Sequence, residues 1–279
     1  MKILSWWSGG IASAVACKKI LEQYDDVKIV FIDTKNEHPD TYRFLMDCEA
    51  WYDRPIETVT NTNYERIEMV WLEHLNLNYG GAGAVCSAEL KRKVREQIQR
   101  QDDYDHQVFG FDFSEHELGR AISMSMNYPE VGGIYPLLQY GYTKEDCVKI
   151  LQEAKIELPV PYVMGYRNNN CYQTGCIQGG IGYWKKIKKE EPKKFYKMAV
   201  WEHLLTDLSN DPVTVLYQKP RLRQKYGNIF LVPHPDYHNI PSIESRRGSY
   251  VKPLVECNGF CGTYDLVKNK HKVKSDFDV

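Results

Sequence analysis

The 279-residue sequence has no apolar run near the roughly 20 residues that a membrane-spanning helix needs. Its first seven residues, Met1 to Trp7, are too short for a secretory signal peptide, and two glycines follow them closely. We therefore expect no membrane segment and a cytoplasmic location. In that compartment cysteines stay reduced, which excludes a disulfide framework and leaves simple thiols, metal ligands or catalytic groups.

The sequence also lacks an excess of charge, an internal repeat and a low-complexity tract. Its formal net charge is −1, so no overall field attracts polynucleotides or anionic membranes, and nucleic-acid binding would need a local basic patch. Hydrophobic residues make up 43% and charged residues 26%, as in ordinary globular proteins. The length is sufficient for one sizeable α/β domain with an appendage, or for two small domains.

Short apolar segments alternate with helical patterns over the first half of the chain. We expect strands at 3–7, 27–32, 56–59 and 107–110, and helices at 11–24, 40–51, 64–74 and 89–100. This alternation predicts an α/β fold with a Rossmann-like, five- or six-stranded, mostly parallel sheet and helices on both faces. Ligands of such sheets bind outside the carboxyl ends of the strands.

The segment Ser8-Gly9-Gly10-Ile11-Ala12-Ser13 connects the first expected strand to the first helix. The glycines let the backbone bend and approach an anion, and the N–H groups at the helix start favour phosphate. The two serines add hydroxyl donors. No Gly-Lys-Ser/Thr follows, so this is not a Walker loop. A plain strand-to-helix turn is the alternative, but the position in the βαβ pattern favours phosphate binding.

This segment resembles the PP-loop of N-type ATP pyrophosphatases and sulfonucleotide reductases, which are phosphoadenosine phosphosulfate (PAPS) reductase-like proteins of the adenine nucleotide alpha hydrolase-like, HUP-type group. The resemblance covers about residues 1–180 and implies an enzyme of that fold. Four further segments match the family in order. Residues 31–42 contain Asp-Thr and Thr-Tyr, and residues 86–93 contain Cys and Leu-Lys. Residues 110–121 end in Arg-Ala, and residues 135–171 contain Pro-Leu, Leu-Pro and Gly-Tyr-Arg.

The sequence departs from this family at several positions. Ala12 replaces the usual PP-loop Asp, which alters the expected handling of metal or pyrophosphate. Lys35 stands where glycine is common, and Val85 replaces the first of two paired cysteines. The Glu-Cys-Gly-Leu-His tail of sulfonucleotide reductases is missing, and the segment most similar to it is residues 256–261.

The resemblance implies a set of nucleotide-binding and catalytic residues. Asp33 would accept from a ribose hydroxyl or the adenine amino group, or else act as a helix N-cap. Arg120 would offer a bidentate fork to phosphate or sulfate, or else form a surface ion pair. Arg92 and its neighbouring lysines would face the nucleotide or solvent. The cofactor-binding set is Ser8, Gly9, Gly10, Ser13, Asp33 and Thr34, and the catalytic set is Arg120, Glu115 and Arg92.

The eight cysteines form two groups. Three lie in helical stretches and are expected to be buried packing residues: Cys17, Cys48 and Cys147. The others lie in loops rich in glycine and asparagine. By resemblance to iron–sulfur members of the family, Cys86, Cys171 and Cys176 match three ligand positions, and Cys261 or Cys257 would replace the fourth. Four thiolates suit a [4Fe-4S] cluster or a structural zinc ion, and unliganded or catalytic thiols are the alternative.

The composition changes near Gly165. We predict a PP-loop nucleotide-binding domain over 1–165 and a Cys-bearing extension over 166–279, with a basic helix starting near Tyr183 and an irregular, proline-rich tail. The lysines of 185–194, with Tyr183 and Trp184, would hold a tRNA or DNA backbone, or else form an exposed amphipathic helix. His234 and His238 would bind metal or belong to a simple loop.

The implied function is ATP-dependent adenylation of an acceptor for sulfur transfer, with Mg²⁺ neutralising the leaving pyrophosphate. The acceptor is unidentified, and a nucleobase in tRNA or DNA is one option. A sulfonucleotide (APS/PAPS) reductase releasing sulfite is the first alternative, and a catalytically lapsed nucleotide- or nucleic-acid-binding module is the second. Expected partners are an adenine nucleotide, a sulfur donor or thioredoxin-like reductant, and a second copy of the chain.

Overall fold

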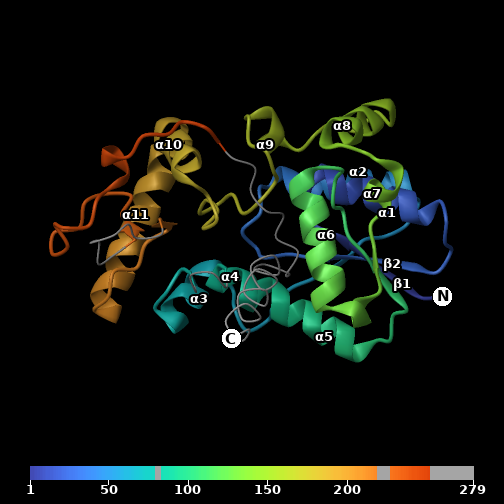
Figure 1. Cartoon of the computed structure of the whole chain (residues 1–279), viewed down its shortest axis with the longest axis horizontal. Helices are drawn as coiled ribbons and strands as arrows, with labels where there is room; N and C mark the ends of the chain where they lie inside the picture. The colour runs from blue at the N-terminus through green and yellow to red at the C-terminus, as the bar shows by residue number, and fades with distance from the viewer. Residues whose placement is uncertain (79–82, 219–226, 252–279) are drawn as a thin grey trace, which may run out of the picture.

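The computed structural model describes residues 1–78, 83–218 and 227–251. Its centre is a sheet of five parallel strands in the order β3-β2-β1-β4-β5 (Figure 1). This confirms the predicted fold class and fixes the strand number. The strands are β1 (Ile3–Trp7), β2 (Val27–Ile32), β3 (Glu57–Val59), β4 (His106–Val108) and β5 (Gly133–Ile134).

Helices cover both faces of this sheet because its strands are apolar on both sides. In β1, Ile3 and Trp7 belong to one core, whereas Leu4 and Trp6 belong to the core on the opposite face. The first face carries α1 (Ile11–Leu21), α2 (Asp40–Tyr52), α7 (Pro136–Tyr140) and α8 (Lys144–Glu153). The second face carries α5 (Lys93–Gln101), α6 (Glu115–Asn127) and a 3₁₀ turn, Pro129–Val131.

A third core lies beside the sheet domain, where Figure 1 shows α10 and α11 next to each other. It unites residues of 64–90 with residues of 166–243, so the C-terminal part packs on an excursion of the sheet domain. The division at 165 remains a prediction. The elements here are α3 (Ile67–His74), α4 (Val85–Ser87), a π-helical turn (Ala88–Arg92), α9 (Val160–Val163), α10 (Ile181–Glu190), α11 (Pro192–Ser209), β6 (Leu216–Tyr217), β7 (Asn228–Ile229) and a 3₁₀ turn (Ile243–Ser245).

The expectation of an irregular stretch after the basic helix was wrong. Helix α11 follows α10 almost directly and has 18 residues, and β6 pairs with β7 in an antiparallel ribbon. Glu202 of α11 is fully buried and joins these elements. Its Oε1 accepts from the Val215 N–H at 2.8 Å, and its Oε2 accepts from the Leu231 N–H at 2.7 Å. Burial raises the pKa of Glu202 to about 8, against the lowering effect of these two donors.

The cysteines expected to be packing residues are buried as predicted. Cys17, Cys48 and Cys147 each have no exposed surface and belong to the core under α1. Burial raises the pKa of the Cys17 and Cys48 thiols to about 12. These two thiols are therefore protonated at neutral pH and unreactive as nucleophiles. None of the described helices has the length and apolar content needed to cross a membrane.

Candidate nucleotide and cysteine site

The loop between β1 and α1 is held in shape by its two serines. Ser13 Oγ donates to the Gly10 carbonyl at 2.9 Å and accepts from the Ser8 N–H at 3.0 Å and the Ser8 hydroxyl at 2.9 Å. Gly9 has φ +82°, a left-handed conformation that favours glycine. The two serines predicted to contact phosphate thus also shape the loop.

Two glycines, one in this loop and one packed against it, leave little room for a side chain. A Cβ on Gly9 would lie 3.0 Å from Thr41 Cγ2. A Cβ on Gly110, just after β4, would lie 2.5 Å from the Ser13 nitrogen. The backbone of Gly110 therefore packs directly against the start of α1. As a result, the residues that follow Gly110 lie close to the loop. Tyr162 also contacts it, since its hydroxyl accepts from the Ile11 N–H at 3.3 Å.

Asp33 lies at the carboxyl end of β2 and caps the turn that follows. Its Oδ1 accepts from the Lys35 N–H at 2.7 Å, and the Tyr42 hydroxyl donates to the same carboxylate at 3.0 Å. The helix N-cap alternative was wrong, because Pro39 is the N-cap of α2. Lys35 has φ +58°, which explains why glycine is common there in the resembled family.

A buried acid–base pair follows Asp33 and was missed from the sequence. The Thr34 hydroxyl donates to Glu37 Oε1 at 2.9 Å, and Lys91 Nζ lies 3.8 Å from the same oxygen. Burial raises the pKa of Glu37, while the Lys91 charge opposes this shift. Lys91 is only 6% exposed, so of the two alternatives for these basic residues the solvent-facing one is wrong for Lys91. Arg92 ends the π-helical turn, a geometry frequent at functional sites.

The loop carrying Cys171 and Cys176 is hydrogen-bonded to both segments described above. Asn169 Nδ2 donates to the Gly9 carbonyl at 2.9 Å, and the Tyr172 N–H donates to the Asn36 carbonyl at 2.8 Å. Cys171 Sγ lies 3.8 Å from Thr34 Oγ1. The structure therefore brings a cysteine to the strand end that carries the predicted adenosine-binding residues.

The three described candidate ligands share the third core. Cys86 and Cys176 are buried in it, and half-buried Cys171 packs against it. Asn170 Nδ2 donates to Cys176 Sγ at 3.9 Å, the kind of contact that stabilises a thiolate. Cys257 and Cys261 lie outside the described residues, and the four-ligand centre stays a prediction.

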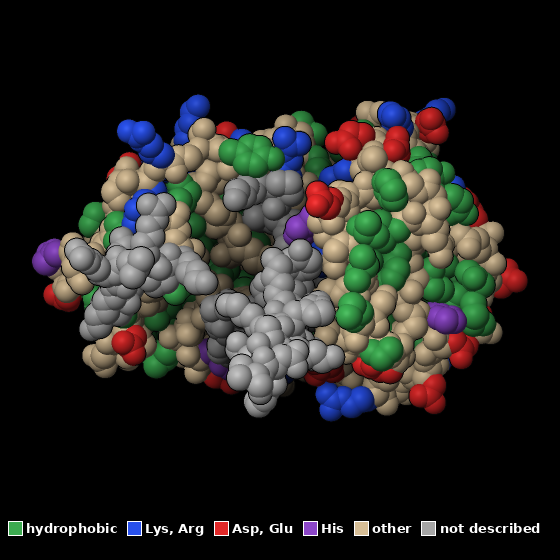
Figure 2. Space-filling view, viewed as in Figure 1, with side chains coloured by type: hydrophobic (Ala, Val, Ile, Leu, Met, Phe, Trp, Pro, Cys, Tyr) green, Lys and Arg blue, Asp and Glu red, His purple; other side chains and the backbone are tan. Residues whose placement is uncertain are grey.

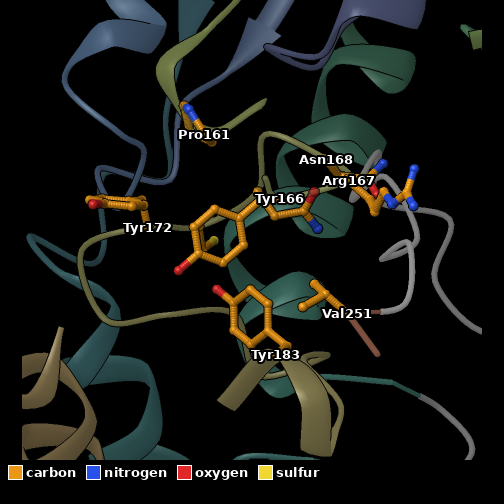
Figure 3. Close-up of a pocket in the computed structure, with 9 residues that line it drawn as sticks. Pro161, Tyr166, Arg167, Asn168, Tyr172, Tyr183 and Val251 are labelled. Atoms are coloured by element: carbon orange, nitrogen blue, oxygen red, sulfur yellow. The ribbon is translucent and has the colours of Figure 1, made fainter. Parts of the chain in front are cut away.

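A small cavity adjoins Cys171 and is walled by tyrosines (Figure 3). The rings of Tyr166 and Tyr183 lie 5.4 Å apart, and the Tyr183 hydroxyl accepts from the Cys176 N–H at 3.0 Å. The Tyr166 hydroxyl is buried with no hydrogen-bond partner within the described ranges. The other lining residues are Pro161, Arg167, Asn168, Asn170, Tyr172 and Val251.

One trio of described residues brings possible metal-ligating atoms close together, and it is not the cysteine trio. The ligand atoms of Asp207, His234 and Asp236 all fall within 4.8 Å of one another, whereas Cys86, Cys171 and Cys176 form no such trio. His234 Nδ1 accepts from the Asp236 N–H at 3.2 Å, and its Nε2 lies 3.2 Å from Asp207 Oδ1. Metal binding and a simple loop both remain open for His234.

Two of the three predicted catalytic residues, Arg120 and Glu115, lie on α6, whereas Arg92 lies in the π-helical turn. Arg120 is 5% exposed, so it forms no surface ion pair. Its Nη1 donates to Glu117 Oε2 at 2.6 Å, and its guanidinium lies 4.4 Å from the centre of the Phe111 ring. Since Phe111 directly follows Gly110, Arg120 is connected to the PP-loop through one ring. Glu115 is exposed in the first turn of α6.

The basic helix is less available for nucleic acid than the sequence suggested. Trp184 is fully buried and Tyr183 is 6% exposed, so neither ring is available for stacking on a base. Most of the lysines have acceptors within the chain, which supports the amphipathic-helix alternative. These contacts are Lys185 to the Arg246 carbonyl, Lys186 to Glu190, Lys188 to Glu244 and Lys194 to Glu191.

A family comparison agrees with the fold. Residues 2–174 match the model of a family described as phosphoadenosine phosphosulfate reductase domain. A phosphoadenylyl-sulfate (PAPS) reductase from Candida auris, in a phosphate complex, has 14% identity and a TM-score of 0.46, covering 62% of this chain and 82% of that one. The U34-tRNA thiolase NcsA from Methanococcus maripaludis, with its [4Fe-4S] cluster, has 12% identity and a TM-score of 0.37, covering 74% and 72%. No curated protein matches.

Proposed function

Because the chain belongs to the phosphoadenosine phosphosulfate reductase domain family, we propose that it binds ATP or a related adenine nucleotide and adenylates an acceptor for sulfur transfer. One observation carries this proposal. The loop of Cys171 and Cys176 is hydrogen-bonded to the Gly9 carbonyl, and Cys171 Sγ lies 3.8 Å from Thr34 Oγ1. The loop that carries these two cysteines thus lies against the predicted nucleotide-binding loop.

The phosphates of ATP bind at residues 8–13, where the N-terminus of α1 favours anions. The adenosine end lies near Asp33 and Thr34. An acceptor oxygen attacks the α-phosphorus, the bond to the β-phosphate oxygen breaks, and pyrophosphate leaves. A sulfide-level sulfur then attacks the activated carbon and AMP leaves, so no net oxidation occurs. Ala12 supplies no carboxylate to this loop, so phosphate oxygens and water would hold Mg²⁺ here, where it would neutralise the leaving pyrophosphate.

The cysteines fit thiolate ligation by their chemistry and burial. Cys86, Cys171 and Cys176, with Cys261 or Cys257, would hold a [4Fe-4S] cluster, whose chemistry is to bind or deliver sulfur. A structural zinc ion held by the same four thiolates is the second candidate. Asn170 and the buried tyrosines orient this loop.

The direct test is the product released from each nucleotide. With ATP and a mixture of small-RNA and DNA acceptors, pyrophosphate release is expected. With adenylyl sulfate or its 3′-phosphorylated form and a thioredoxin-like reductant, no sulfite should appear. Sulfite release without pyrophosphate would instead establish a reductase. Tight nucleotide binding with neither product, in reduced and metal-replete protein, would indicate a lapsed binding module.

Gly10→Val should abolish nucleotide binding while the fold survives. Gly10 has φ −95° and ψ 158°, an extended conformation open to a β-branched residue, but the side chain would occupy the phosphate position. Loss of charge-assisted contacts of about 1.5–3 kcal/mol each predicts at least a ~100-fold weaker Kd for ATP. Calorimetric titration with ATP measures this change.

The matched control is Gly180→Val. Gly180 is likewise an extended N-cap, of α10, and a Cβ there meets no atom within 4 Å. Its variant should bind ATP as the unmodified chain does. If Gly10→Val also binds normally, the loop is only a turn and the proposed function fails.

Arg120 is proposed to assist nucleotide binding from behind Phe111. Both Arg120→Lys and Arg120→Ala should weaken ATP affinity, by about 1.5–3 kcal/mol or roughly 10- to 150-fold, because an ammonium reproduces neither the planar fork nor the stacking. Arg100→Ala is the control, since that side chain on α5 is 77% exposed. Unchanged affinity with a lowered melting temperature would show that Arg120 only holds α6 in place.

A further inference from the structure

Helix α11 has an apolar stripe on its exposed face. Tyr196, Val200, Leu204 and Leu208 are 51%, 66%, 39% and 49% exposed, and their four-residue spacing places them in one row. The opposite face is buried in the third core. A helix that is apolar on both faces is normally covered on both, so the stripe calls for a partner.

Charges flank this stripe with opposite signs at its two ends. Lys193 and Lys197 are exposed at the N-terminal end, and Asp207 and Asp211 at the C-terminal end. The Lys197 side chain is 59% exposed and lies 3.1 Å from Glu68. The Asp207 side chain is 62% exposed, with an oxygen 3.2 Å from His234 Nε2. Both charges therefore have room for a second contact.

The pattern is symmetric about position 202. Tyr196 and Leu208 are each six residues from it, Val200 and Leu204 two residues, and Lys197 and Asp207 five. In an antiparallel pair of identical helices, equidistant residues meet across the twofold axis. Apolar side chains would thus meet apolar ones, and each lysine would meet an aspartate.

We propose that α11 is the contact surface of a homodimer in which two copies of α11 pack antiparallel about a twofold axis level with residue 202. The occupant of the stripe is a second copy of this chain because the charge pattern is complementary to itself. At about 1.5 Å per residue, the helix offers a contact roughly 27 Å long. Such an interface is small, so the dimer dissociates in the micromolar range.

A second exposed stripe, on α6, lacks this self-complementarity. Figure 2 shows apolar side chains gathered over α6, where Leu118, Ile122 and Met126 are 43%, 53% and 60% exposed. The first turn of α6 is acidic, and its last turn has no basic residue. Two antiparallel copies would therefore gain no charge pairs. This stripe provides the matched control.

Val200→Glu tests the centre of the interface, with sedimentation equilibrium from low micromolar to high micromolar protein as the measurement. The unmodified chain should dimerise. In the variant, each glutamate would lie against Leu204 of the second copy, close to the axis, and burying two charges in the apolar contact should raise the dimer Kd at least about 100-fold. Ile122→Glu, an equal change on α6, should leave the Kd unchanged. Circular dichroism melting confirms that both variants fold.

The charge pairs are tested by exchange within one chain. Lys197→Asp and Asp207→Lys should each weaken the dimer roughly tenfold, because two pairs become repulsive. The double variant keeps every disturbance to Glu68 and His234 but restores both intermolecular pairs, so its Kd should return to near the original value. A monomeric unmodified chain, a dimer insensitive to Val200→Glu, or a double variant no better than the singles would each overturn the proposal. A monomer that binds an unrelated protein through α11 would overturn it as well.

Discussion

Replacing Cys86, Cys171 or Cys176 with serine is expected to abolish the proposed metal centre completely. A hydroxyl is a poor ligand for iron or zinc compared with a thiolate, and a centre with one ligand missing does not hold its metal through purification. The variants should be colourless if the centre is a [4Fe-4S] cluster. Iron, sulfide and zinc assays on protein purified without oxygen measure the effect independently of any activity.

Serine at Cys17 is the matched control for these variants. Cys17 is fully buried, and its sulfur lies 3.1 Å from the Ser5 hydroxyl, inside the core under α1. Its replacement should leave the metal content unchanged. Cys257→Ser and Cys261→Ser, tested separately, identify the fourth ligand. Unmodified protein without iron or zinc, or serine variants that retain it, would refute the centre.

Glu202→Ala is expected to cost about 2–6 kcal/mol of folding free energy. The change leaves the N–H groups of Val215 and Leu231 buried without their acceptor, and each such loss costs about 1–3 kcal/mol. That is a large part of the stability of an ordinary domain, about 5–15 kcal/mol. Urea denaturation followed by tryptophan fluorescence measures it. Glu153→Ala, at an exposed position of α8, should change little.

The same residue predicts how stability depends on pH. Burial raises the pKa of Glu202 from 4.5 to about 8, so between these values the unfolded chain releases the proton and the folded chain keeps it. The contribution to stability is complete below pH 4.5 and is lost as pH rises to 8, with a slope of at most about 1.4 kcal/mol per pH unit. Glu202→Gln cannot titrate, so its stability should lack this slope. Identical slopes in both proteins would contradict the assignment.

The βαβ half of the fold was predictable because its signals are local. The segment from β1 to β2 combines apolar strands, a glycine turn and a helix with apolar spacing, and each needs only neighbouring residues. Helix α11 escaped prediction because apolar residues occur on both of its faces, which hides the helical period. Strand β5 has only two residues, too few for any pattern.

The site was predictable where glycine, serine and cysteine mark it, and less so where burial depends on a distant partner. Lys91 is buried beside Glu37, which is far away in the sequence and offsets part of the cost of desolvating the ammonium group. Asn169 belongs to a run of three asparagines that indicated only a loop, although its amide reaches Gly9. Such contacts are properties of the tertiary structure and leave no periodic trace in the sequence.

The Asn169 amide has a consequence for how the two halves of the site respond to each other. It donates both to the Gly9 carbonyl at 2.9 Å and to the Thr41 hydroxyl at 3.0 Å. One amide group therefore connects the cysteine loop, the PP-loop and α2. A ligand that shifts Gly9 must also shift or break these bonds. For the proposed nucleotide and the proposed metal, thermodynamic linkage would make the effect reciprocal: the factor by which nucleotide changes metal affinity would equal the factor by which metal changes nucleotide affinity.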